Sequence, residues 1–212
     1  MRLTKLVHSC IRLERDGRTL VIDPGVFGAD EDLAGADAVL VTHEHPDHVD
    51  VTRLQRALAA DEDLHVWTNA AVARLLDQEF AARVDVIAGG DTFEAAGLDV
   101  RVHGEQHALV RDDLPIVANT GYLIEGVFHP GDAFTVPDQS VSRLLLPINA
   151  PWAKLNETLV QLRAVCPTHV HPIHDASLSE IGRQTYGAHA EQISAQVGCT
   201  FRWLMPGDTV DL

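Results

Sequence analysis

The nine residues from Thr42 to Asp50 constrain this chain more than any other stretch. The apolar run Ala38–Val41 directly precedes them and predicts a short buried strand. Pro46 disfavours a regular helix after that strand, so we expect a loop whose successive side chains point to different sides. Four potential metal ligands lie within this loop: His43, His45, Asp47 and His48. Imidazole nitrogens and carboxylate oxygens are the usual ligands of zinc and related metals, so the stretch predicts a metal site.

Composition and charge narrow the classes of protein to which the chain can belong. The 212 residues are 46% hydrophobic and 22% charged, as in ordinary globular proteins. No low-complexity tract or linker interrupts them, so we expect a single domain over residues 1–212. Sixteen basic and thirty-one acidic residues leave a net charge of −15, which repels phosphate backbones. Nucleic acid is therefore a poor partner, whereas a small-molecule substrate at a metal site remains compatible with this charge.

The cysteines and the apolar runs indicate a cytoplasmic protein. Cys10, Cys166 and Cys199 are an odd number without paired spacing, which disfavours a disulfide framework or a zinc ribbon. The first six residues lack the apolar region of a secretory signal. No apolar run approaches the roughly 20 residues that are needed to cross a membrane. The oligomeric state cannot be read from the sequence.

Strands are predicted in hairpin runs, with helices interspersed in each half of the chain. The strands are expected at residues 2–7, 10–14, 18–22, 38–41, 64–68, 84–88, 92–95, 98–103, 116–125, 127–129, 143–147 and 168–171, with short ones at the C-terminus. Helices are expected at residues 50–60, 70–78 (with Asn69 as N-cap), 152–165 and 188–197. This order is not the strict alternation of a Rossmann fold or a barrel. Two mixed sheets packed face to face, with helices outside, would accommodate it.

The spacing His43-x-His45-x-Asp47-His48 after a strand resembles the signature of the metallo-β-lactamase-fold metallohydrolases. The resemblance is nearest to the short members that are ascorbate-phosphate-lactonase-like or uncharacterised metal-dependent hydrolases. It extends over nearly the whole chain, through the pair Asp23-Pro24 and the segment Leu144–Ile148. It implies an α/β (α+β) fold, a four-layer αββα sandwich of two mixed sheets with helices outside.

The resemblance also assigns the remaining ligands. His107 matches the third histidine of the family, which completes a first site with His43 and His45. His103 competes with it, but strand alternation places His103 on the polar face with Arg101. Asp132, in Pro130-Gly131-Asp132, matches the aspartate that bridges the two metals, and one carboxylate has two oxygens with which to do so. A plain Pro-Gly-Asp turn is the alternative there, and it is the interpretation that we favour for Pro206-Gly207-Asp208.

A second site is implied near the end of the chain. His174, in Pro172-Ile173-His174, matches the last ligand of the family and would complete a site with Asp47 and His48. His171 is the alternative, either as the ligand or as a contact that supports it. His8 corresponds to a histidine near the metals in the family opening, although a plain strand-end histidine fits equally well. Trp152 can line the substrate pocket or pack at the start of a helix.

The resemblance implies a binuclear metal-dependent hydrolase. Two zinc ions, with manganese or iron as alternatives, would lower the pKa of a bridging water towards 7, and the resulting hydroxide would attack an ester-like substrate. A lactone, a thioester or a phosphodiester fits this chemistry. Asp47 and Asp132 are the expected catalytic carboxylates, with Asp47 orienting the hydroxide. The alternative is a mononuclear-iron oxidoreductase of the same fold, similar to the persulfide dioxygenases. The sequence does not identify the substrate.

Overall fold

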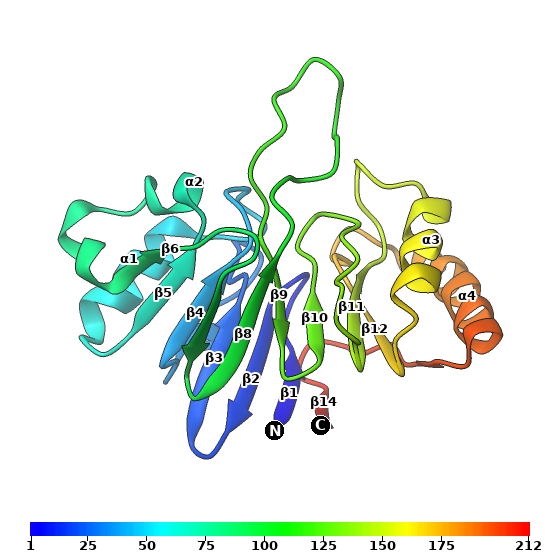
Figure 1. Ribbon diagram of the computed structural model, residues 1–212, viewed down its shortest axis with the longest axis horizontal. Coiled ribbons are helices and arrows are strands. Elements are labelled where there is room, and N and C mark those ends of the chain that lie inside the picture. Colours follow the sequence, from blue (N-terminus) through cyan, green and yellow to red (C-terminus); the bar gives the residue numbers. More distant parts are fainter.

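The computed structural model describes residues 1–212, which form two mixed seven-stranded sheets (Figure 1). The first sheet has the order β14-β1-β2-β3-β4-β5-β6. Its strands are β1 (Arg2–Lys5), β2 (Ile11–Arg15), β3 (Arg18–Ile22), β4 (Ala38–Val41), β5 (His65–Thr68), β6 (Val84–Val86) and β14 (Thr209–Asp211). The second sheet has the order β13-β12-β11-β10-β9-β8-β7. Its strands are β7 (Thr92–Ala95), β8 (Leu98–His103), β9 (Gly121–Ile124), β10 (Val127–His129), β11 (Arg143–Pro147), β12 (His169–Ile173) and β13 (Thr200–Phe201).

Helices cover the two outer faces, so the predicted four-layer αββα architecture is confirmed (Figure 1). Against the first sheet lie the helices α1 (Val51–Ala60) and α2 (Ala70–Ala73) and the 3-10 helices η1 (Asp30–Leu33) and η2 (Gln78–Arg83). Against the second sheet lie α3 (Leu155–Val165) and α4 (Glu180–Val197). No helix combines the length and the apolar character that crossing a membrane requires.

Three apolar clusters hold the layers together. The largest lies between the sheets and includes Leu13, Leu40 and Leu145. The other two lie between each sheet and its helices. Strand β4 packs against both a sheet and helices, and its four residues are all buried, as the apolar run predicted. Strand β8 instead alternates, with Val100 and Val102 buried and Arg101 exposed, because only one of its faces meets the core.

The directions of the strands bring many loops to a single edge of the sandwich. In the first sheet β1, β3, β4, β5 and β6 run the same way, and in the second sheet β8, β10, β11, β12 and β13 do. These strands all end at the edge from which the long β8–β9 loop rises, while both termini lie at the opposite edge (Figure 1). The buried hydroxyl of Tyr122 on β9 donates to Val41 O at 2.7 Å, and this hydrogen bond ties the two sheets together near that edge.

Three predicted elements begin three or more residues away from the expected position. The strand expected from residue 116 begins only at Gly121, because residues 116–120 belong to the projecting loop. Helix α4 begins at Glu180 rather than near residue 188, with the Ser179 hydroxyl capping Gly182 N. The helix expected over residues 152–165 begins at Leu155. The start of α4 is thus set by a local cap that the prediction missed, whereas the strand from Gly121 and the helix from Leu155 start where tertiary contacts allow.

The helix predicted over residues 70–78 is interrupted after one turn. Asn69 is its N-cap, as expected, and accepts hydrogen bonds from Ala71 N and Val72 N. The chain is then drawn back onto α1, where Gln55 Oε1 accepts a hydrogen bond from Asp77 N at 2.8 Å. Phe80 enters the apolar cluster below α1 as part of η2. Burial of that ring on a 3-10 turn takes the place of the continuous helix.

Lys5 is a fully buried cation that joins two loops at the edge of the sandwich from which the β8–β9 loop rises. Its Nζ donates to Leu6 O at 2.8 Å and to His8 O at 2.6 Å, and it lies 3.3 Å from Asp175 Oδ1. Burial lowers the pKa of Lys5, although the Asp175 carboxylate opposes this shift. The lysine therefore stabilises the turn that carries His8 and the turn that follows β12.

We expect the substitution Lys5→Met to destabilise the protein by about 3–5 kcal/mol, because it leaves a buried carboxylate and two carbonyls without their partner. For a chain of this size the melting temperature should fall by roughly 10 °C. Circular dichroism melting curves of the metal-free protein measure the change. The exposed Lys154 provides the control, since Lys154→Met should shift the melting temperature by no more than about 2 °C. Equal shifts in both variants would contradict the role of Lys5.

Candidate metal centre

All seven residues expected to hold metal lie at the edge where the parallel strands end. Four of them follow β4, in the loop whose spacing led to the prediction. His107, Asp132 and His174 follow β8, β10 and β12. Side chains distant in sequence meet here because the carboxyl ends of parallel strands share one edge of a sheet.

The ligand loop after β4 is held by a neighbouring loop rather than by regular structure. His48 N and Val49 N both donate to His45 O, which turns the chain back on itself. The β3–β4 loop then closes over it, with Val26 N donating to Pro46 O at 2.8 Å. The two loops lie so close together that there is no room for a side chain at Gly25, where a Cβ atom would lie 1.9 Å from Asp47 O.

A first group of ligand atoms comes from His43, His45, His107 and Asp132, all within 4.8 Å of one another. His43 Nε2 lies 3.1 Å from His45 Nδ1. Asp132 Oδ2 lies 3.3 Å from His107 Nε2 and 3.9 Å from His43 Nε2. Three nitrogens and one carboxylate oxygen are a donor set that suits zinc. His107, not His103, joins this group.

A second group comes from His8, Asp47, His48 and His174, again within 4.8 Å. Asp47 Oδ2 lies 3.2 Å from His8 Nε2 and 3.5 Å from His174 Nε2. Asp132 reaches this group as well, since its Oδ1 lies 3.1 Å from His48 Nε2 and its Oδ2 lies 3.0 Å from His174 Nε2. One carboxylate thus faces both groups.

Hydrogen bonds on the far side of each ring orient the histidines. His48 Nδ1 lies 2.6 Å from Asp23 Oδ2, and the same carboxylate accepts hydrogen bonds from the backbone and hydroxyl of Thr42. His174 Nδ1 lies 2.7 Å from Asn149 O, and His107 Nδ1 lies 2.5 Å from Ala108 O. These contacts assign the proton of each ring to Nδ1, so that Nε2 presents a free lone pair to the centre.

His8 has the opposite tautomer. Ala176 N donates to His8 Nδ1 at 3.3 Å, so the ring proton resides on Nε2 and points at Asp47 Oδ2. His8 therefore acts in this geometry as a donor to Asp47 rather than as a ligand. Its backbone has φ +59°, and His174 and Asp23 also have positive φ, at +57° and +52°. Such conformations cost about 1 kcal/mol or more each and recur at functional sites.

Four buried ligand atoms have no hydrogen-bond partner, which provides a direct test of whether metal fits. They are His48 Nε2, His107 Nε2, Asp132 Oδ1 and His174 Nε2. Three nitrogens approach the Asp132 oxygens at 3.0–3.3 Å, yet their directions are not those of hydrogen bonds. Buried polar atoms are rarely left unsatisfied. The residues therefore fit divalent metal, for which these unsatisfied atoms would serve as ligands.

The charges within the centre act in the same direction. Burial by itself lowers the pKa of His174, but the Asp132 and Asp47 carboxylates outweigh this effect and raise its pKa to about 9. His48 shows the same balance, with a pKa well above its usual value because of Asp132 and Asp23. Conversely, these two histidines hold the pKa of buried Asp132 well below its usual range. The centre as built attracts positive charge.

Trp152 contacts the centre in a way that its sequence context did not reveal. Its indole Nε1 donates to Asp132 Oδ2 at 2.8 Å, and its ring meets the edge of His107 at 5.6 Å. This inward position explains why α3 begins three residues later than predicted. The sequence also provided no signal for the Asp23–His48 contact or for the buried position of Lys5 beneath His8.

The histidines that competed for ligand roles lie elsewhere. His171 Nδ1 lies 2.9 Å from Arg202 O, and its Nε2 faces Arg143 at 3.2 Å, away from the metal ligands. The ring of His103 packs edge-on against Phe128 at 5.9 Å. Pro206-Gly207-Asp208 is a turn, in which Asp208 N donates to Met205 O. His174, His107 and Asp132, by contrast, lie in the groups of residues that could hold metal.

Comparison with known sequences shows where the same pattern recurs. A family model described as the β-lactamase superfamily domain matches residues 2–174. The protein Rv0786c of Mycobacterium tuberculosis is 36% identical over 193 residues, which cover 88% of this chain and 89% of that protein. A UPF0173 metal-dependent hydrolase of Agrobacterium fabrum is 34% identical over 118 residues, covering 51% of this chain and 48% of its own.

Solved structures show the same fold at lower identity. Igni18, described as a novel metallo hydrolase of the archaeon Ignicoccus hospitalis, aligns with a TM-score of 0.74 at 22% identity. The alignment covers 99% of this chain and 97% of that one. At this level of identity the similarity concerns the fold, the two stacked sheets with helices outside.

The raised pKa of His174 predicts how the stability of the metal-free protein depends on pH. A group whose pKa is raised on folding stabilises the fold fully below its unfolded value of about 6.5, and this contribution is lost as the pH rises through about 9. We therefore expect the protein, measured in chelator by calorimetry, to melt several degrees lower at pH 9.5 than at pH 6.5. The metal-loaded protein, whose histidines are already neutral, should show a smaller difference. An equal decrease in both forms would contradict the assignment.

Proposed function

Because the chain belongs to the β-lactamase superfamily domain family, whose relatives include metal-dependent hydrolases, we propose that it is a binuclear enzyme that cleaves a small ester-like substrate. A lactone, a thioester or a phosphodiester is the proposed class. The observation that carries the proposal is the position of Asp132, whose carboxylate faces both groups of ligands and has an unsatisfied oxygen between them.

The residues divide into two sets that would hold one ion each. His43, His45 and His107 would hold the first, and Asp47, His48 and His174 the second, with Asp132 between them. Two divalent ions in these positions supply a hydroxide nucleophile at neutral pH and polarise the oxygen of the scissile group. Zinc suits the nitrogen-rich donors, and manganese or iron is compatible with them.

The protein's own groups then position the reactants. Asp47 is the most accessible carboxylate of the centre, since its side chain is 27% exposed, whereas that of Asp132 is 3% exposed. Asp47 is therefore placed to orient the attacking water. The Nε2 proton of His8 points at Asp47 Oδ2 and holds the carboxylate in position. Trp152 and Asn119 secure the shared aspartate, the first through its indole and the second by accepting a hydrogen bond from Asp132 N at 3.0 Å.

The main alternative is a mononuclear-iron oxidoreductase of the same fold. A single iron needs only the first group of ligands, and the second group would then have no role. The unsatisfied Nε2 atoms of His48 and His174 in that second group favour the binuclear hydrolase. Metal content and oxygen consumption separate the two functions.

The proposal includes a cytoplasmic location and a small-molecule substrate. All three cysteines are free thiols, with Cys10 and Cys199 buried, as is usual in a reducing compartment. The net charge of −15 is unsuited to nucleic acid.

Metal content measured by elemental mass spectrometry, on protein purified without a tag or chelator, tests the proposal directly. We expect about two zinc or manganese ions per chain. About one iron per chain, together with oxygen consumption, would instead favour the oxidoreductase. Protein that binds no metal even after reconstitution would contradict both functions.

Replacing Asp132 with Ala should remove metal and activity together, because the shared carboxylate contributes to both sites. We expect metal content to fall below one ion per chain and hydrolysis to fall by about a thousandfold or more. Asp138→Ala is the matched control, since Asp138 is an exposed carboxylate on the same β10–β11 loop. Full retention of two metals and of activity in Asp132→Ala would disprove the bridging role.

A further inference from the structure

Exposed apolar side chains gather on two loops beside the metal centre. Of the twelve large apolar residues with exposed side chains, five lie on the β3–β4 and β8–β9 loops: Val26, Phe27, Leu109, Leu114 and Ile116. Phe27 is 55% exposed and Leu109 is 54% exposed. Apolar surface in water costs about 25 cal/mol per Å², so a group of such residues around a site indicates a surface that binds something apolar.

The β3–β4 loop brings Phe27 directly to the second group of ligands. The ring of Phe27 meets the ring of His8 edge-on at 5.3 Å, and the ring of His8 lies 4.0 Å from that of His174. Arg53 on α1 is buried and holds the loop in place by donating to Gly25 O and Gly28 O. The phenyl ring is therefore fixed beside the centre even though half of it faces solvent.

The β8–β9 loop brings Leu109 and Ile116 to the first group. Leu109 follows Ala108, whose N–H donates to Asp132 O at 2.8 Å. Ile116 precedes Val117, whose carbonyl accepts a hydrogen bond from His107 N at 3.0 Å. The loop rises from the ligand edge, above the ends of both sheets (Figure 1). The ring of Trp152 lies beside both groups of ligands, 5.6 Å from the ring of His107 and 6.0 Å from that of His174.

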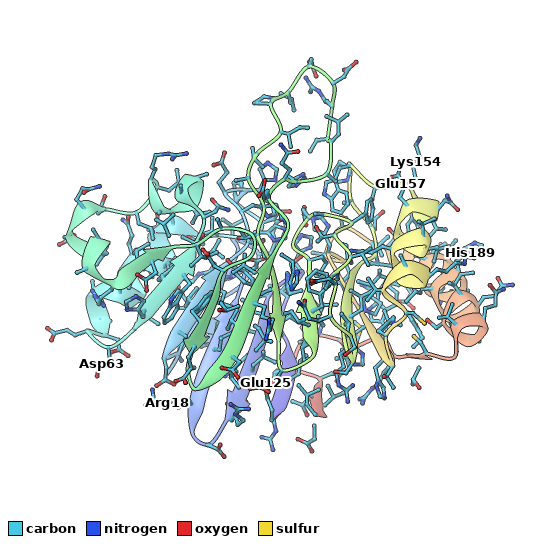
Figure 2. All side chains as sticks on the ribbon, viewed as in Figure 1. Arg18, Asp63, Glu125, Lys154, Glu157 and His189 are labelled. Atoms are coloured by element: carbon cyan, nitrogen blue, oxygen red, sulfur yellow. The ribbon has the colours of Figure 1, made fainter.

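Positive charge is scarce around the same edge. Arg111, on the β8–β9 loop, forms two hydrogen bonds to Asp113, at 2.8 and 2.6 Å. Arg53 pairs with Asp50, and Lys5 is buried beneath His8. Lys154 remains as a cation outside any salt bridge, and Figure 2 shows it at the start of α3 with its side chain directed outward. Beyond the metal ions, a phosphate group would therefore find few partners here.

We propose that the substrate is an uncharged carboxylic ester, thioester or lactone with an apolar acyl or aryl group, which packs against Phe27 and Leu109. The inference rests on the proposed hydrolase function and narrows its substrate class. In the reaction the oxygen of water bonds to the carbonyl carbon and the C–O or C–S bond breaks. A proton from the water passes to the leaving oxygen or sulfur, so the products are a carboxylic acid and an alcohol or thiol, or a single hydroxy acid from a lactone, and no further reactant is needed.

Three chromogenic substrates and the zinc-loaded protein test the proposal. They are p-nitrophenyl acetate, p-nitrophenyl octanoate and bis(p-nitrophenyl) phosphate. We expect kcat/KM for the octanoate to exceed that for the acetate by about tenfold or more, because the longer chain reaches Phe27 and Leu109. These exposed side chains form the apolar rim of the site. Hydrolysis of the phosphodiester should be slower than that of either ester. Equal rates for the two esters, or a preference for the phosphodiester, would overturn the proposal.

Paired variants assign the preference to named side chains. Phe27→Ser and Leu109→Ser should each reduce the octanoate-to-acetate ratio by about threefold or more, whereas Phe27→Leu, which stays apolar, should retain it. Ile181→Ser is the control, because Ile181 is 76% exposed on α4 and belongs to neither of the two loops. Its ratio should not change. An unchanged ratio in both serine variants would also overturn the proposal.

Binding of the product provides a measurement that is independent of turnover. Calorimetric titration of the zinc-loaded protein should show octanoate binding about tenfold more tightly than acetate, with the difference reduced in Phe27→Ser. If octanoate is favoured but no ester is hydrolysed, the proposed hydrolase function fails while the apolar rim stands. If both esters are hydrolysed at equal rates, the hydrolase function stands and the proposed apolar contacts are wrong. If the serine variants change only the oligomeric state, seen by analytical ultracentrifugation, the two loops bind a second copy and the proposal is wrong.

Discussion

The burial of the Asp132 carboxylate is the constraint on which the rest of the centre depends. An ionised carboxylate that is 97% shielded from solvent costs several kcal/mol unless partners surround it. Here the indole N–H of Trp152 donates to the carboxylate at 2.8 Å, and three imidazole nitrogens lie at 3.0–3.3 Å, close enough to share a bound cation with it. They come from four different segments of the chain. The fold must therefore bring four loops to one point, because burying the Asp132 carboxylate is unfavourable unless groups from all four surround it.

The stacked sheets meet this need through the direction of their strands. Ten strands end at one edge, so ligands and the residues that orient them approach the centre from both sheets. The contacts behind the ligands are as specific as the ligands themselves: Asp23 orients His48 at 2.6 Å, and the carbonyl of Asn149 orients His174 at 2.7 Å. The positive φ angles of His8, Asp23 and His174 show that the backbone is held in conformations of higher energy to keep this geometry.

The centre and its surroundings have opposite character. The interior is polar and charged, with paired carboxylates and imidazoles, whereas the two flanking loops expose phenyl and aliphatic side chains. Most cations nearby already bind carboxylates or carbonyls of the protein itself. Such a combination places a polar reacting group at the metals and leaves apolar contacts for the rest of the molecule. This division explains why an acidic protein can hold a site that attracts cations without offering a surface for anions.

Much of the fold and of the centre was predictable from the sequence, because the signals are local. The apolar run before Thr42 predicted β4, and Asn69 predicted an N-cap. The spacing of histidines and aspartate after β4 predicted four of the seven candidate ligands. The family resemblance then supplied His107, Asp132 and His174 as candidates, and the geometry brings all three to one edge.

The tertiary structure decided what depends on contacts between distant residues. The short α2 and the late start of α3 follow from the burial of Phe80 and Trp152, which no local preference reveals. The tautomer of His8 depends on an N–H donated from Ala176, 168 residues away. The apolar rim likewise requires two loops from different sheets to stand beside one centre. The sequence by itself determined which chemical groups and which elements are present. Only the packing of the two sheets decided which groups meet, because a buried charge is stable only where its partners converge.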